Sequence, residues 1–295
     1  MANLSPYVPG VDKPWNKERV IHFYRRLGYG PRPEQLAPAL ATDALVLVES
    51  ALDGIKNKAL PASPVWANYT AEIYDADPDL IGEHRTELFD SIYDEILSDG
   101  LRMKLVMFWH NHFVTELGVY GCNKYLWNYY ALLHKHCVGN FKVFVEAIGK
   151  CPAMLDYLNG NDNEVGKPNE NYARELMELF TMGENNGYTQ NDVVEVARAL
   201  TGYKCNPNIC DNVSFNNAKF DKTNKIIFGK VGNWGYDDVH NLIFTERKTQ
   251  VSRYICGKLY RAFVNKEIDT EFVNALADLF VSSNWELLPV LKTMF

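Results

Sequence analysis

The chain has 295 residues, 47% of them hydrophobic and 13% aromatic, with a formal net charge of -7. Charges of both signs are spread along it without a basic cluster that would neutralise phosphates, which argues against nucleic-acid binding. No apolar run approaches the roughly 18 to 20 residues that a membrane-spanning helix requires. The length suffices for a buried core in one large domain or two modest ones.

Helical periodicity dominates the chain. The stretch WNKERVIHFYRRLGYG predicts a helix that ends at Gly28 and Gly30. Thr189 or Asn191 is expected to cap a later helix with an apolar face. The pattern also predicts helices over residues 33–56, 84–98, 100–117, 120–137, 139–150 and 169–183, and from about 236 to the end. The expected fold class is mainly α, a single multi-helix domain over residues 1–295.

Residues 204–235 interrupt this pattern because they are rich in Asn, Gly and Lys. We expect a small irregular or β-hairpin insertion here, in which KFDKTNKIIFG forms a hairpin with its turn at Asp221–Asn224. Cys205 and Cys210 lie in a loop-like setting, and their spacing exceeds that of a zinc knuckle. A structural metal, a local disulfide and two free thiols all stay open for this pair, and free thiols are favoured.

The two ends of the chain carry different signals. The start, MANLSPYVPGVDKPW, lacks the basic and then apolar regions of a secretory signal, so a cytoplasmic location is the default expectation. The end, from DTEFVNALADLF to LLPVLKTMF, stops within an amphipathic pattern. An apolar helix face normally packs against something, so we expect a C-terminally incomplete copy of a longer domain.

The stretch FWHNHF places His110 and His112 in a helix that is apolar nearly all round and should therefore be buried. Burial lowers the pKa of histidine, so both rings should be neutral and each needs hydrogen-bond partners. Residues two apart on a helix point about 200° away from each other, so one metal ion cannot bind both unless the helix ends between them. Core histidines bonded to carboxylates or carbonyls, and a metal or catalytic role for at least one, both stay open.

The stretch NENYARELMELFTMG, residues 169–183, gathers polar side chains on one helix face. Glu170, Arg174 and Glu178 are spaced for i, i+4 ion pairs, which are typical of an ordinary solvated face. The alternative is a functional site, because Asn171 and Glu175 lie in the same arc. Carboxylates with buried histidines would suit zinc, iron or manganese.

Four segments resemble one bacterial family in their order and sequence: FWHNHFVTE, GNFKVFVEAIGKCPAMLDYLNG, PNENYARELMELFTMG and YTQNDVVEVARALTGY. The family is called domain of unknown function 1800. Its N-terminal and C-terminal blocks are similar to HFYRRLGYGP and YICGKLYRAFVN, so the resemblance covers nearly the whole chain. It implies a largely helical protein, often longer than this chain and frequently exported, but it implies no established activity.

The resemblance carries over residue by residue to both polar motifs. The matching positions are His110, Asn111, His112, Asn169, Glu170, Asn171, Arg174, Glu175 and Glu178. One departure concerns the insertion. Where the family usually has His-Asp before a Lys and a Gly, this chain has Phe220 and Asp221, followed by Lys225 and Gly229. If that histidine were catalytic or a ligand, its loss would argue against activity in this chain.

Together these features predict a metal-dependent, hydrolytic enzyme with a His/Glu/Arg site. The predicted metal ligands are His110, His112, Glu175 and Glu178, and the predicted catalytic residues are Glu170, Arg174 and Asn171. In this hypothesis the metal is zinc, manganese or iron, Glu170 is the general base and Arg174 stabilises an anionic intermediate. At least one histidine ring should then lie within bonding reach of a carboxylate. The alternative is a non-catalytic helical scaffold or binding protein with a structural polar network. Its partner, or the substrate of the enzyme, is not identified.

Overall fold

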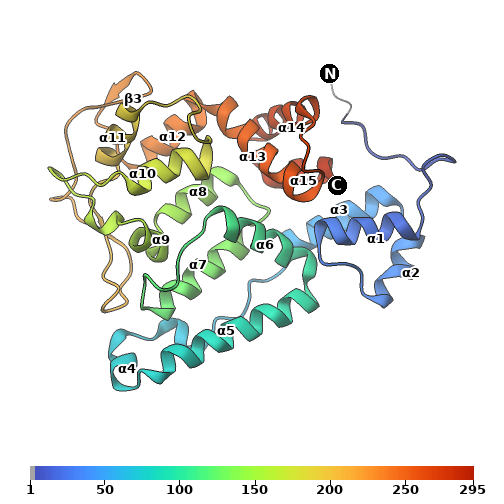
Figure 1. Cartoon of the computed structure of the whole chain (residues 1–295), viewed down its shortest axis with the longest axis horizontal. Coiled ribbons are helices and arrows are strands. Elements are labelled where there is room, and N and C mark those ends of the chain that lie inside the picture. Colours follow the sequence, from blue (N-terminus) through green and yellow to red (C-terminus); the bar gives the residue numbers. More distant parts are fainter. Residues whose placement is uncertain (1–3) are drawn as a thin grey trace.

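The computed structural model describes residues 4–295 and confirms the mainly helical fold class (Figure 1). The first part of the chain is a succession of helices. They are α1 Lys17–Leu27, α2 Pro33–Ala41, α3 Ala44–Asn57, the 3-10 helix η1 Val65–Asn68, α4 Ala71–Ala76, α5 Asp79–Ser98, α6 Gly100–His112, α7 Asn123–His136, α8 Phe141–Gly149 and α9 Pro152–Tyr157.

The second part adds short strands and the C-terminal helices. The helices are the 3-10 helix η2 Gly160–Asp162, α10 Asn171–Glu175, the π-helix η3 Leu176–Thr181, α11 Gln190–Ala199, α12 Tyr236–Glu246, α13 Lys248–Phe263, α14 Thr270–Ser282 and α15 Leu287–Met294. The strands are β1 Tyr203–Lys204, β2 Ser214–Phe215, β3 Lys225–Ile227 and β4 Lys230–Gly232. β1 pairs with β2 and β3 with β4, both antiparallel.

Several helix ends follow local signals. Thr189 caps α11 in a capping box with Asp192, as expected. The predicted helix over 33–56 is instead two helices, because the Asp43 carboxylate accepts hydrogen bonds from the first backbone N–H groups of α3 and starts a new helix there. The helix predicted over 100–117 ends already at His112.

The hairpin in the insertion lies a few residues later than predicted. Its turn is at Phe228 and Gly229, between β3 and β4, and not at Asp221–Asn224. Both turn residues have positive φ, 51° and 78°, as a two-residue type I′ turn requires. The stretch Asp221–Asn224 instead makes polar contacts with Arg198 of α11.

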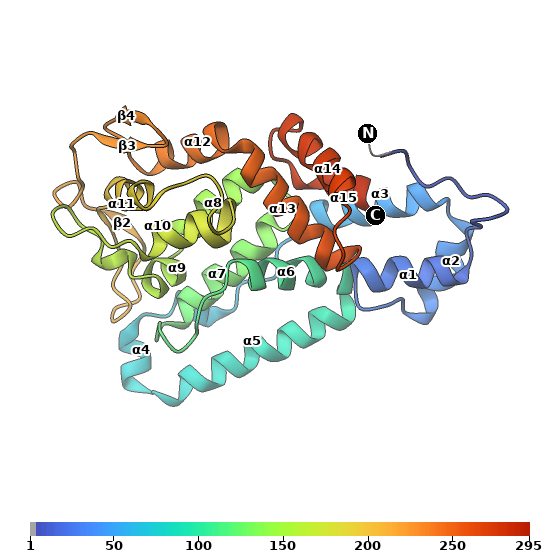
Figure 2. The ribbon, with the colours of Figure 1, turned by 45° about the horizontal axis from the view of Figure 1, so that its top comes forward.

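The helices enclose one continuous cluster of buried side chains that reaches from α1 to α15. Large, fully buried aromatic residues from α6, from its C-cap and from α8 pack together in this cluster, among them Trp109, Phe113, Phe141 and Phe144, and Phe180 of η3 packs against them. The last helices return to the first ones, since α15 contacts α3 (Figures 1 and 2). The core therefore joins segments from both ends of the sequence.

The prediction of two free thiols in the insertion is wrong for one of them. Cys210 forms a disulfide with Cys122, 88 residues earlier, and the two Cα atoms are 5.7 Å apart. Cys205 is free and buried. The disulfide ties the loop after β1 to the start of α7. The sequence does not reveal this pairing, because only the fold brings these two segments together.

Helix α5 is the longest helix of the described chain and follows one edge of the molecule (Figure 2). It has 20 residues, of which only Leu88 is buried. Among residues 4–295, no helix, α5 included, is both long enough and apolar enough to cross a membrane. Since only Leu88 of α5 is buried, much of the surface of this helix is exposed.

Candidate functional site

His112 is a core residue at the end of α6. Its ring is surrounded by Trp109, Phe113 and Phe180, and the residue is 3% exposed. The Nε2 atom lies 3.1 Å from the carbonyl oxygen of Phe180. Because a carbonyl only accepts, Nε2 carries the proton, and the lone pair of Nδ1 has no hydrogen-bond partner within residues 4–295. Burial, and then the charge of Lys258, hold the pKa of His112 well below its usual range.

His110 points to a different neighbour. Its Nδ1 is 2.9 Å from the hydroxyl of Tyr129, which itself donates to the backbone oxygen of Phe113 at 3.0 Å. That hydroxyl has a single proton, so His110 donates to it. Burial lowers the pKa of His110. The two rings thus diverge, as expected for residues two apart on a helix.

The acidic motif forms a partly exposed polar cluster on α10 and η3. Arg174 lies between Glu170 and Glu178, at 2.9 and 3.4 Å, as the i, i+4 spacing predicted. Gln190 of α11 joins them, because it accepts from Arg174 at 3.0 Å and donates to Glu170 at 2.8 Å. The cluster therefore connects α10 with α11.

Asn171 and Glu175 lie outside these contacts. The amide of Asn171 donates to the side chain of Asn159 at 2.9 Å, away from the arginine. Glu175 is partly buried and makes no hydrogen bond or ion pair within residues 4–295. Burial, and then the nearby charge of Glu178, raise the pKa of Glu175. Of the predicted catalytic residues, the structure brings Glu170 and Arg174 together.

His112 contacts the acidic motif through the backbone of the π-helix η3 and makes no hydrogen bond to its carboxylates. Among its carbonyl groups, those of Leu179 and Phe180 accept hydrogen bonds from side chains of other helices: Tyr254 of α13 at 3.2 Å, and His112 at 3.1 Å. A π-helix is a rare element that often marks a functional region. Here His112 satisfies one of its backbone groups. Nothing in the sequence pattern separates this segment from an ordinary α-helix.

The predicted metal ligands His110, His112, Glu175 and Glu178 are not gathered into one group within residues 4–295. The hydrogen bonds of His110 and His112 go to Tyr129 and Phe180, and neither ring is bonded to Glu170, Glu175 or Glu178. Among residues 4–295, no group of three or more His, Cys, Asp or Glu side chains is placed to hold a metal ion. The expected approach of a histidine to a carboxylate of this motif is therefore not found among the hydrogen bonds of the described chain.

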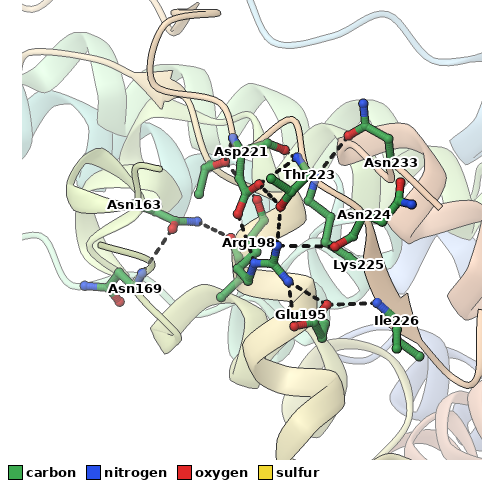
Figure 3. Close-up of polar contacts among 12 residues, drawn as sticks. Asn163, Asn169, Glu195, Arg198, Asp221, Thr223, Asn224, Lys225, Ile226 and Asn233 are labelled. Carbon is green, nitrogen blue, oxygen red and sulfur yellow. Dashed lines mark hydrogen bonds and ion pairs between the residues drawn. The ribbon is translucent and has the colours of Figure 1, made fainter. Parts of the chain in front are cut away.

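A second polar network, which sequence reasoning missed, surrounds Arg198 of α11 (Figure 3). Its guanidinium contacts both carboxylate oxygens of Glu195, at 2.7 and 2.8 Å, and the carboxylate of Asp221 at 2.9 Å. It also donates to Thr223 and to the backbone oxygen of Asn224. The segment predicted as a turn is thus held against α11 by one arginine.

Lys225 completes this network from inside the protein. It is 0% exposed, its ammonium group donates to the backbone oxygen of Asp221 and to Asn233, and it lies 4.6 Å from the ring centre of Phe220. Burial lowers the pKa of Lys225. For Asp221, burial acts to raise the pKa, but hydrogen bonds from Thr223 and Arg198 outweigh it and lower the pKa. Phe220 therefore packs under a buried cation at the position where the resembling family usually has histidine.

The network is positioned by backbone contacts as well. Glu195 accepts from the N–H of Ile226 at 2.8 Å, and Asp192 accepts from the N–H of Phe228 at 2.7 Å, so α11 binds the hairpin at the middle of β3 and at its turn. Asn163, also in Figure 3, bonds the backbone of Ala197 and of Asn169. These polar side chains are used to join chain segments, and their contacts are satisfied within the protein.

The fold and these sites define a mainly helical protein in which polar networks connect the helices and a small two-hairpin insertion. The model of the family described as "Protein of unknown function (DUF1800)" matches residues 22–295, and the chain belongs to that family. No curated protein and no solved structure matched the chain.

Proposed function

We propose that this chain is a non-catalytic helical binding protein that docks a cationic amphipathic helix of a partner protein on the outer face of α5. The observation that carries the proposal is an apolar stripe on that face. Phe89, Tyr93 and Leu97 are 44%, 67% and 74% exposed. They are spaced four residues apart, so they follow one another along the helix. Single exposed apolar residues are common, but an aligned stripe is typical of an interaction site.

The charges beside the stripe favour a cationic partner. Helix α5 contains six acidic residues and one arginine. Asp90, Glu83 and Asp94 are exposed and lie at about 100° to 140° from Phe89 around the helix axis, next to the stripe. A second copy of the chain would bring like charges together, which is unfavourable. An amphipathic helix with basic flanks would match both the apolar and the acidic part of this face.

A synthetic helical peptide with leucine on one face and lysine on the other is expected to bind the protein, and less tightly at higher salt. The Tyr93→Ala/Leu97→Ala variant should weaken this binding at least tenfold, because interface hot spots contribute about 2 kcal/mol or more each. Fluorescence anisotropy with labelled peptide measures the affinity of the wild type at each salt concentration and the affinity of the variant. The control is Val46→Ala, which removes an exposed apolar side chain from another helix, α3.

If the α5 variant binds the peptide as tightly as the wild type, the proposal is wrong. It is also wrong if the wild type binds a peptide with glutamate in place of lysine as tightly as the lysine peptide. A general attraction between an acidic protein and a basic peptide would survive loss of Tyr93 and Leu97. Specific docking on the stripe would not.

The metal-dependent hydrolase stays a prediction, and its test is the Glu175→Gln variant. The raised pKa of Glu175 means that the folded chain binds its proton more readily than the unfolded chain. Its charge therefore costs stability at neutral pH, and this cost disappears as the pH falls below the usual range of glutamate. In a binding protein the neutral variant should melt at the same or a slightly higher temperature at pH 7, with or without added zinc, manganese or iron(II).

A comparison variant for stability is Glu178→Gln, which removes one partner of Arg174 and also one of the predicted metal ligands. A partly exposed ion pair contributes about 0–1 kcal/mol, so a small loss of stability is expected.

The enzyme hypothesis predicts a different result for the metal content. Wild-type protein purified without chelators would then contain stoichiometric metal, and Glu175→Gln would lose it. Elemental analysis of both proteins decides between the two functions.

A further inference from the structure

A large groove lies between the first and the last helices of the chain. Its volume is about 1020 Å³, and its walls come from the segment before α1, from α1 and α3, and from the ends of α13, α14 and α15. Ligand pockets in proteins usually enclose roughly 300–1,000 Å³, so the groove can hold a sizeable small molecule. No residue of the α5 stripe lines it. It is therefore a separate site from the proposed docking face.

One side of the groove is apolar. Phe23 and Val48 line it from α1 and α3, and Phe263, Phe272 and Met294 line it from the C-terminal helices. These side chains offer no hydrogen-bond donors or strong acceptors. A ligand that follows them must present an apolar body, and its removal from water provides the driving force for binding.

The other side is cationic. Arg19, His22 and Arg26 lie on one face of α1, three and four residues apart, and all three line the groove. Partial burial, and then the charges of Arg26 and Arg19, lower the pKa of His22, so the three groups influence one another. Arg19 lies over the ring of Tyr7, 5.2 Å from its centre.

The two arginines have no carboxylate partner. Among residues 4–295, neither Arg19 nor Arg26 takes part in an ion pair, whereas Lys292 at the opposite wall is paired with Asp53 at 2.8 Å. The lining also includes Glu18 and Glu49, which form no ion pair with them. A chain with a net charge of -7 thus leaves two guanidinium groups available beside an apolar surface. Guanidinium groups bind carboxylates and phosphates through paired hydrogen bonds.

We propose that this groove binds an anionic amphiphile, a molecule with one long alkyl chain and a carboxylate or phosphate head group. Arg19 and Arg26 hold the head group, and His22 adds a hydrogen bond from its neutral ring. The alkyl chain lies against Phe23, Phe263 and the other apolar side chains. The ligand is a small molecule, so this site does not depend on a protein partner at α5.

The test is isothermal titration calorimetry with decanoate, decyl phosphate and decanol, all below their aggregation limits, and with acetate and inorganic phosphate. Decanoate or decyl phosphate should bind at least tenfold more tightly than decanol, and the stronger of the two identifies the head group. Acetate and inorganic phosphate, which lack the chain, should give no measurable binding. Binding of decanol equal to that of both anionic ligands would overturn the proposal.

Variants locate the site. Arg19→Gln/Arg26→Gln should weaken the anionic ligands at least tenfold and leave decanol unchanged, because only the head-group contacts are lost. The matched control is Arg25→Gln, which removes the neighbouring exposed arginine of α1, outside the groove lining. An equal loss of affinity in the control, or no loss in the double variant, would exclude head-group recognition in this groove. Unchanged thermal midpoints show that the variants are folded.

Discussion

The Gly149→Ala variant is expected to lose about 3 kcal/mol of unfolding free energy, although alanine is the better helix former. Gly149 is the last residue of α8, and a Cβ atom there would lie 2.1 Å from the hydroxyl oxygen of Tyr172 and 2.2 Å from that of Tyr236. Both rings are buried, and Tyr236 donates to the backbone oxygen of Glu146 at 2.7 Å. Neither hydroxyl can move away without displacing α10 or α12.

Chemical denaturation of the variant and the wild type measures this effect. The control is Gly54→Ala in α3, where a Cβ atom would meet nothing within 4 Å. That change should stabilise the protein by roughly 0.5–1 kcal/mol, because only helix propensity and chain entropy act. If Gly149→Ala is as stable as Gly54→Ala, the close approach of the two tyrosines to α8 is wrong.

Reduction of the Cys122–Cys210 disulfide should lower the unfolding free energy by about 2–5 kcal/mol. The bond closes a loop between residues 88 positions apart. The chain-entropy model assigns a loop of that length about 4.6 kcal/mol of stabilisation through the unfolded state. The folded loop also depends on neighbouring contacts, since Lys124 donates to the backbone oxygen of Cys210 at 3.1 Å. Thermal unfolding with and without dithiothreitol measures the difference.

The Cys122→Ala/Cys210→Ala variant separates this bond from other effects of the reductant. It should melt at the lower temperature of the reduced wild type, and dithiothreitol should change it no further. If the wild type has the same melting temperature with and without dithiothreitol, the Cys122–Cys210 disulfide is contradicted. Disulfides persist mainly in oxidising compartments, and the family resemblance implies that members are frequently exported, so we propose that this chain is exported rather than cytoplasmic.

Local signals in the sequence predicted much of the fold. The end of α1 at Gly28, the capping of α11 by Thr189 and the ion pairs of Arg174 with Glu170 and Glu178 all follow from residues within one or two turns. Such contacts depend on helix geometry alone, because side chains three or four residues apart must lie on one face. The divergence of His110 and His112 was predictable for the same reason.

Only the tertiary structure decided which distant groups these side chains meet. His112 donates to Phe180, Arg198 binds Asp221, and Cys122 pairs with Cys210, in each case across more than 20 residues. No periodicity encodes such pairs, because they depend on how whole helices pack and where the chain turns. The sequence by itself thus determined a mainly helical chain with two polar motifs. The packing decided that His110 bonds to Tyr129 and His112 to the backbone of Phe180, since buried polar groups need partners and only the fold brings these segments together.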